Sequence, residues 1–95
     1  SQNSVEVPVT SLDDFFIDKD IIIDVLKIDT EGADTWVLQG AEGLLRSHKI
    51  RHIFFEENAT RMAALGLLPG EAQAFLQSCG YQVERLGGND WSAHL

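Results

Sequence analysis

The chain has 95 residues, of which 44% are hydrophobic and 23% charged, as is ordinary for one soluble globular domain. Seven basic against fifteen acidic residues give a net charge of −8, which argues against nucleic acid and anionic membranes as partners, because both need clustered Lys and Arg. A single cysteine, Cys79, excludes an intrachain disulfide and a thiolate metal cluster. The sequence shows no signal peptide and no membrane-spanning run, so we expect a cytoplasmic protein.

The N-terminal third predicts a short strand, a short helix and a longer apolar strand. Residues 5–9 alternate as a strand, and Pro8 favours an edge position because it cannot donate to a ladder. Ser11 is expected to cap a short helix whose apolar residues follow at i, i+3 and i+4. Residues 23–29 then form an apolar run rich in branched side chains, which is typical of a central strand in a parallel sheet.

The apolar pattern changes to the period of a helix after Gly32. Apolar residues between Ala33 and Leu45 recur at helical spacing, which predicts one helix of about fifteen residues. Gly40 lies on the same face and suggests close packing of this helix on the sheet. Residues 50–55 form a second strand, so the three elements make a βαβ unit with parallel strands and a right-handed crossover.

The C-terminal third predicts two further helices and a hairpin. Asn58 is expected to cap the first helix, and Gly80 is expected to end the second in the left-handed conformation. Residues 81–86 alternate as a strand, residues 87–90 form a turn, and residues 91–95 return antiparallel.

These elements predict a single α/β domain over residues 1–95, with parallel strands, packed helices and an antiparallel hairpin at the C-terminal edge. A central strand as apolar as residues 23–29 needs neighbours on both sides. Either residues 5–9 pair there, or an edge stays open and pairs with a second copy of the chain, giving a homo-oligomer.

Acidic residues follow both predicted parallel strands, where ligands of open α/β sheets bind. Asp29 and Glu31 follow the first strand, and Lys27 shares a face with Asp29. Glu56 and Glu57 follow the second strand. These carboxylates are candidates for holding a polar substrate or for taking a proton from a substrate hydroxyl. The alternative is that the first pair only caps the next helix and the second pair is solvated in a loop.

Other kinds of site find less support. Clustered carboxylates can hold Mg²⁺ or Ca²⁺, but the three histidines show no ligand spacing, so no metal is predicted. The sequence shows no Ser-His-Asp or Cys-His arrangement and no glycine-rich phosphate loop after a strand. Cys79 falls on the apolar face of a predicted helix, where a buried structural thiol is expected.

Several segments resemble the C-terminal half of FkbM-type methyltransferases. They are VTSLDDF at residues 9–15, IDVLKIDTEGAD at 23–34, VLQGA at 37–41, IFFE at 53–56 with Asn58, and Gly80-Tyr81. The most specific part is LKIDTEG at residues 26–32, followed by LQGA at 38–41.

This resemblance implies a Rossmann-like class I fold and transfer of a methyl group from S-adenosylmethionine (SAM) to a small-molecule or sugar hydroxyl. It implies Asp29, Glu31 and Glu56 as catalytic residues. Substrate-binding roles fall on Lys27 and Asn58, and cofactor contacts on Asp29 and Thr30.

The family's glycine-rich cofactor loop, and the acidic residue that grips the ribose after it, are not found in the sequence. The resemblance therefore implies the C-terminal part of a methyltransferase domain. We expect it to be inactive alone, with SAM held by the intact parent enzyme and not tightly by this fragment. The alternative is a non-catalytic α/β module that homo-oligomerises through an open sheet edge.

Overall fold

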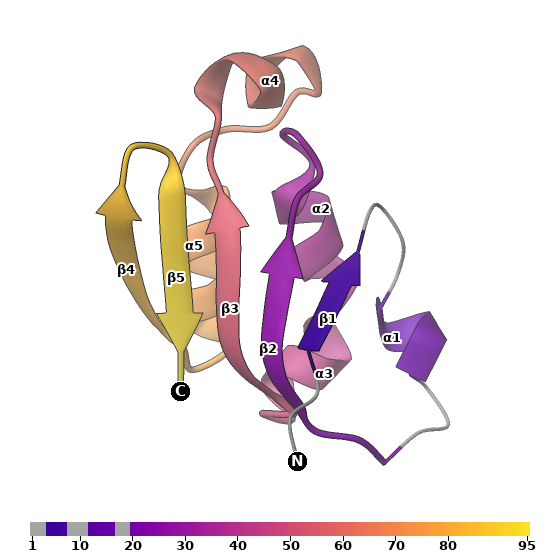
Figure 1. Ribbon diagram of the computed structural model, residues 1–95. Coiled ribbons are helices and arrows are strands. Elements are labelled where there is room, and N and C mark those ends of the chain that lie inside the picture. The colour runs from indigo at the N-terminus through magenta and orange to yellow at the C-terminus, as the bar shows by residue number, and fades with distance from the viewer. Residues whose placement is uncertain (1–3, 8–11, 17–19) are drawn as a thin grey trace.

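The computed structural model describes residues 4–7, 12–16 and 20–95. In chain order the elements are β1 (Ser4–Val7), α1 (Leu12–Phe16), β2 (Ile23–Ile28), α2 (Asp34–Gln39), α3 (Glu42–Arg46), β3 (Ile50–Glu56), α4 (Ala59–Ala64), α5 (Glu71–Ser78), β4 (Gln82–Gly87) and β5 (Asp90–His94). They form an α/β fold around one five-stranded sheet with the order β1-β2-β3-β5-β4 (Figure 1). None of the described helices has the length and apolar character needed to cross a membrane.

The parallel part of the sheet confirms the predicted strand–helix–strand unit. β2 and β3 pair in parallel, and β1 pairs in parallel with the other side of β2. β2 thus has neighbours on both sides, which confirms the first of the two alternatives for this strand. β1 is also an edge strand, as the proline in the segment predicted; Pro8 itself, Val9 and the predicted cap Ser11 lie outside the described residues.

The predicted C-terminal hairpin is also present. β5 pairs antiparallel with both β3 and β4, so the returning strand is inside the sheet and β4 is at its edge. A bulge between Arg85 and Gly87 precedes the turn, where Gly87 and Gly88 have positive φ. Gly80 ends α5 at φ +96°, in agreement with the predicted left-handed glycine.

The single helix predicted for residues 33–45 is wrong, because it is interrupted between α2 and α3. The backbone N–H of Asp13 donates to the Gly40 carbonyl at 3.0 Å. Its carboxylate accepts from the N–H of Gly43 at 2.8 Å and from that of Leu44 at 3.0 Å. Asp13 therefore replaces the bond that a continuous helix would form between the Gly40 carbonyl and the Leu44 N–H.

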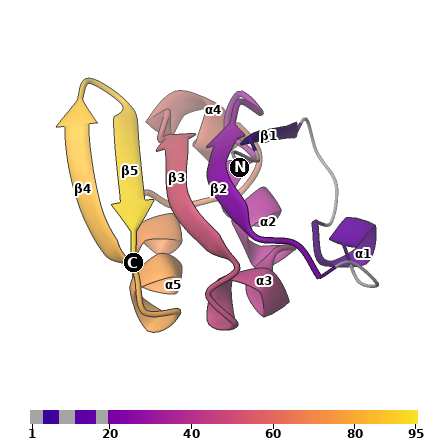
Figure 2. The same ribbon diagram turned by 60° about the horizontal axis from the view of Figure 1, so that its bottom comes forward.

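The core lies between the sheet and the helices α2, α3 and α5, which all pack on the same face (Figures 1 and 2). β2, β3 and β5 turn Leu26, Ile53 and Ala93 towards these helices, and each is at most 1% exposed. Leu76 of α5 is fully buried against them, and Cys79 is buried, as the predicted structural thiol requires. Covering each large apolar side chain contributes about 1.5–3 kcal/mol. This packing fixes the strands whose ends form the site.

The opposite face of the sheet carries no described helix, and we call it the open face. The register aligns Lys27 with Phe54, Phe54 with Ser92, and Ser92 with Glu84, so these four residues share that face. Charged and apolar side chains are mixed here, whereas the helix-covered face is apolar. The candidate site lies at one end of this open face.

Candidate functional site

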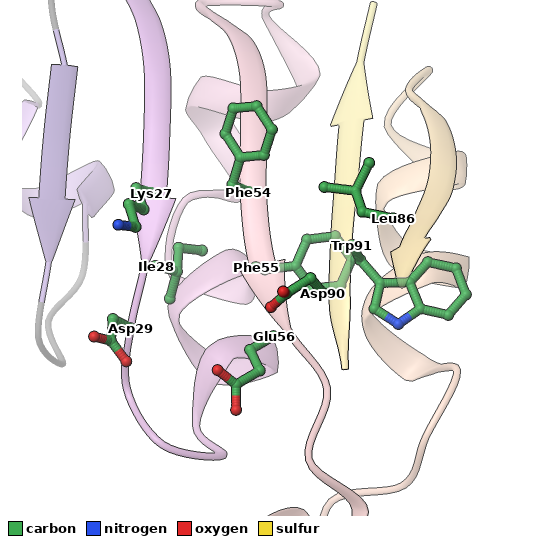
Figure 3. Close-up of a pocket in the computed structure, with 9 residues that line it drawn as sticks. All are labelled: Lys27, Ile28, Asp29, Phe54, Phe55, Glu56, Leu86, Asp90 and Trp91. Carbon is green, nitrogen blue, oxygen red and sulfur yellow. The ribbon is translucent and has the colours of Figure 1, made fainter. Parts of the chain in front are cut away.

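A cavity of about 560 Å³ lies where β2 and β3 end and β5 begins (Figure 3). Nine residues line it: Lys27, Ile28, Asp29, Phe54, Phe55, Glu56, Leu86, Asp90 and Trp91. The volume is within the range of small-molecule sites, roughly 300–1,000 Å³. The position, beyond the carboxyl ends of parallel strands, is where open α/β sheets bind ligands.

The strand register explains why the polar side chains meet in this cavity. Lys27 is aligned with Phe54 on the open face, and residues two positions further along each strand share that face. Asp29 and Glu56 are those residues. Asp90 joins them because it is aligned with Glu56 at the start of β5. Three carboxylates and one ammonium group thus come from three neighbouring strands.

The polar side chains of this cavity have no partner among the described residues. The side chains of Lys27, Asp29, Glu56 and Asp90 form no hydrogen bond or ion pair with any other described residue. Lys27, Asp29 and Asp90 are exposed, and Glu56 is half-buried. Their hydrogen-bonding capacity is therefore available to a ligand.

Two of the residues predicted for the site are outside the cavity. Glu31 lies in the turn after β2 at φ 55°, and its side chain is 72% exposed. It forms an ion pair with the Nη1 atom of Arg61 at 2.8 Å. Asn58 caps α4 by accepting from the backbone N–H of Arg61 at 3.1 Å, which confirms the predicted cap. Both residues therefore contact α4.

Thr30 contacts a buried carboxylate that the sequence reasoning did not select. Its hydroxyl donates to the Oδ1 atom of Asp34, and its backbone N–H donates to the same atom at 3.3 Å. The Oδ2 atom of Asp34, a residue only 3% exposed, accepts from the backbone N–H of Glu56 at 2.8 Å. Asp34 thus ties the end of β2 to the end of β3 and holds the two cavity strands in register.

Glu57 has a structural role at the same edge of the sheet. Its Oε2 atom accepts from the backbone N–H of Gly70 at 2.8 Å and from the side-chain amide of Gln73 at 2.9 Å. It thereby fixes the start of α5, so the expectation of a solvated Glu57 is wrong. The expectation that Asp29 and Glu31 cap the next helix is also wrong, because no side chain caps the N-terminus of α2.

Three lining residues that the sequence analysis did not select come from the C-terminal hairpin. Leu86, Asp90 and Trp91 come from the hairpin, which was predicted, but nothing in the sequence showed that β5 would pair with β3. The ring of Trp91 stacks on Phe55, with centroids 6.4 Å apart. The acidic turn residue Asp90 was the one available hint.

The end of β2 and the loop after it contain Asp29 and Thr30, the two residues predicted to contact SAM. Gly32 has φ +112°, and a Cβ there would lie 2.9 Å from the Cβ of Arg61, so this glycine serves the close approach of α4. The Thr30 hydroxyl is already bonded to Asp34, which leaves Asp29 as the predicted cofactor contact with a free side chain. Of the two predicted cofactor contacts, only Asp29 has a side chain that lines the cavity. In the described segments, no three His, Cys, Asp or Glu residues are placed to hold a metal ion.

Comparison with curated proteins and with solved structures found no match to the chain. The family model of the methyltransferase FkbM domain matches residues 1–83. The matched region covers most of the chain, including the strands β1, β2 and β3. It also includes six of the nine cavity residues: Lys27, Ile28, Asp29, Phe54, Phe55 and Glu56. The chain belongs to the FkbM methyltransferase family, whose members are generally SAM-dependent.

Proposed function

We propose that the cavity is the acceptor side of an O-methyl transfer site and binds a small-molecule or sugar hydroxyl. The observation that carries this proposal is the meeting of Asp29 and Glu56, from adjacent parallel strands, in one cavity with unpaired side chains. Membership of a methyltransferase family supplies the reaction class. The size of the cavity supports a small acceptor.

The role of the chain in this reaction is to align the acceptor oxygen and to receive its proton. A carboxylate oxygen of Asp29 or Glu56 accepts a hydrogen bond from the acceptor hydroxyl and takes the proton as the oxygen is methylated. The ammonium group of Lys27 donates to a second oxygen of the acceptor. Most of the rate enhancement comes from alignment, because a fixed approach replaces a bimolecular encounter.

Glu31 and Asn58 act in this proposal as positioning residues. Both hold Arg61, and Arg61 lies against Gly32 in the loop that follows the cavity strand. Through this contact they fix the path of the chain directly after Asp29. Loss of either side chain should therefore change turnover through the position of Asp29.

We further propose that residues 1–95 are the C-terminal part of a methyltransferase domain and are inactive as an isolated chain. The sequence has no glycine-rich loop after a strand to hold the cofactor, which supports this proposal. Calorimetric titration of SAM into the chain tests it, and we expect no tight binding. The same titration with any native residues that precede Ser1 restored should show binding, whereas tight binding to the 95-residue chain would contradict the proposal.

Turnover of that lengthened protein tests the catalytic role. Asp29→Asn should lower turnover by about 10²–10⁴-fold if Asp29 is the base. The control is Asp24→Asn, which alters another carboxylate of the same strand outside the cavity. Unchanged turnover in both Asp29→Asn and Glu56→Gln would remove these residues from catalysis.

The exposed edge strand β4 supports a second candidate, a non-catalytic module that pairs with its own copy. β4 is at the end of the sheet, and most of its side chains are exposed. An uncovered edge presents backbone N–H and C=O groups to another strand. A light-scattering mass well above 10.5 kDa would support this candidate, and a clean monomer would count against it.

A further inference from the structure

The cavity has an apolar side that the proposed proton transfer does not use. Phe54 is 40% exposed and Leu86 53% exposed, and both line the cavity from strands on either side of β5. Figure 3 shows them above the three carboxylates in the same cavity. Large apolar side chains left this open gain free energy when a ligand covers them. The ligand therefore presents an apolar ring or chain to this side.

The polar side of the cavity carries a surplus of negative charge. The cavity is lined by three carboxylates and one ammonium group, which give it a formal charge of −2. The carboxylates are those of Asp29, Glu56 and Asp90, and the ammonium group is that of Lys27. None of the four is neutralised by another described side chain. A phosphate or carboxylate entering the cavity meets this repulsion, whereas an ammonium group forms charge-assisted hydrogen bonds.

We infer that the acceptor is a hydroxylated amine with an apolar ring or chain. The inference rests on the proposed function, because it assigns a substrate class to the same cavity. The amine pairs with the carboxylates that the acceptor hydroxyl leaves free, and Asp90 is the first of these because Asp29 and Glu56 are the proposed proton acceptors. The apolar part covers Phe54 and Leu86, and the aromatic face of Phe54 also favours a nearby cation.

Three small probes separate charge from shape. Tyramine, tyrosol and 4-hydroxyphenylacetate share a hydroxyphenyl group and carry charges of +1, 0 and −1 at neutral pH. Each is titrated into the 95-residue chain while backbone amide signals are followed by ¹H–¹⁵N NMR at low salt. We expect tyramine to bind best, about 3–10-fold better than tyrosol, and the acid to bind weakest, with shifts centred on β2, β3 and β5 at the cavity.

Two variants and one matched control test which residues give this order. Asp90→Asn should weaken tyramine by about 3–10-fold and leave tyrosol unchanged. Phe54→Ser should weaken both ligands. Glu84→Gln is the control, because this carboxylate is on the open face but does not line the cavity. Amide spectra of each variant establish that it is folded before the titration is interpreted.

The inference is overturned if the acid binds as well as the amine, if the shifts are centred elsewhere, or if Glu84→Gln weakens tyramine as much as Asp90→Asn. None of these results depends on SAM, so the inference can fail while the methyl-transfer proposal stands. A loss of SAM binding or of Asp29-dependent turnover in the lengthened protein would instead contradict the proposed function.

Discussion

Two pairs of carboxylates at the same end of the sheet behave differently. Asp34 and Glu57 accept backbone N–H groups and hold α2, β3 and α5 together. Asp29 and Glu56, five and one residues earlier in the chain, form no side-chain hydrogen bond or ion pair with another described residue. Nearness in sequence therefore does not decide the role of a carboxylate. The direction of the side chain does: a carboxylate facing backbone donors stabilises the fold, and one facing the open side of the sheet remains free for a ligand.

The largest effect on stability is expected for Asp34→Ala, which tests the structural role of this carboxylate. The substitution removes the buried carboxylate that accepts from the partly buried N–H of Glu56 and hydroxyl of Thr30, so we expect a loss of about 2–4 kcal/mol in unfolding free energy. Urea denaturation measures it. Asp34→Asn, which keeps one carbonyl acceptor, should lose less. A loss below about 1 kcal/mol for the alanine variant would contradict the structural role.

A smaller effect is expected from Asp13→Ala. Two backbone N–H groups of α3 lose their acceptor, as in the removal of a helix cap, which costs about 1–2 kcal/mol. Glu42→Gln is a control in the same helix, because its pair with Arg46 is exposed and should leave the urea midpoint nearly unchanged. Equal midpoints for the two variants would show that Asp13 does not hold the break between α2 and α3.

Asp13 also shows where prediction from sequence fails for this fold. Period-two and helical patterns located the strands and helices, because apolar side chains must face one core. The same helical pattern runs through Gly40 and Ala41 without a change, so it predicted one helix. The interruption depends on a side chain about thirty residues earlier, and local spacing carries no information about such a partner.

For the candidate site too, the sequence predicted some residues and not others. Strand alternation and parallel pairing were enough to bring Lys27, Asp29 and Glu56 to one edge of the sheet. Asp90 and Leu86 were not predictable, because their places depend on β5 pairing with β3 as well as with β4. Composition could not separate Glu56 from Glu57 either, since only the path of the chain after β3 turns one of them towards Gly70.

The other end of β3 gives a pH-dependent test. The Tyr81 hydroxyl donates to the Ile50 carbonyl, and burial raises the pKa of Tyr81 from 10.0 to about 12. The unfolded chain therefore loses this proton first, so stability is complete below pH 10 and falls as the pH rises towards about 12. Tyr81→Phe should cost about 1 kcal/mol at pH 7 through the lost hydrogen bond.

Urea unfolding at pH 9 and pH 11.5 measures this dependence. The Tyr81→Phe variant should lose less stability between the two values than the natural chain does, because the titrating hydroxyl is gone. An identical loss in both proteins would assign the alkaline transition to other groups. A smaller loss in the variant would show that the Tyr81 hydroxyl holds the start of β3.

The smallest effects on stability are expected at the cavity carboxylates Asp29 and Glu56. They test whether a carboxylate on the open face has no structural role. Asp29→Asn and Glu56→Gln remove no hydrogen bond or ion pair to a described residue, so the unfolding free energy should stay within about 0.5 kcal/mol of the natural value. Removing one of three neighbouring like charges can even raise it slightly. Glu57→Gln is the matched variant and should lose more, because its carboxylate holds Gly70 and Gln73. If Asp29→Asn were as costly as Asp34→Asn, the free carboxylates would be part of the structural set and the ligand site would lose its main support.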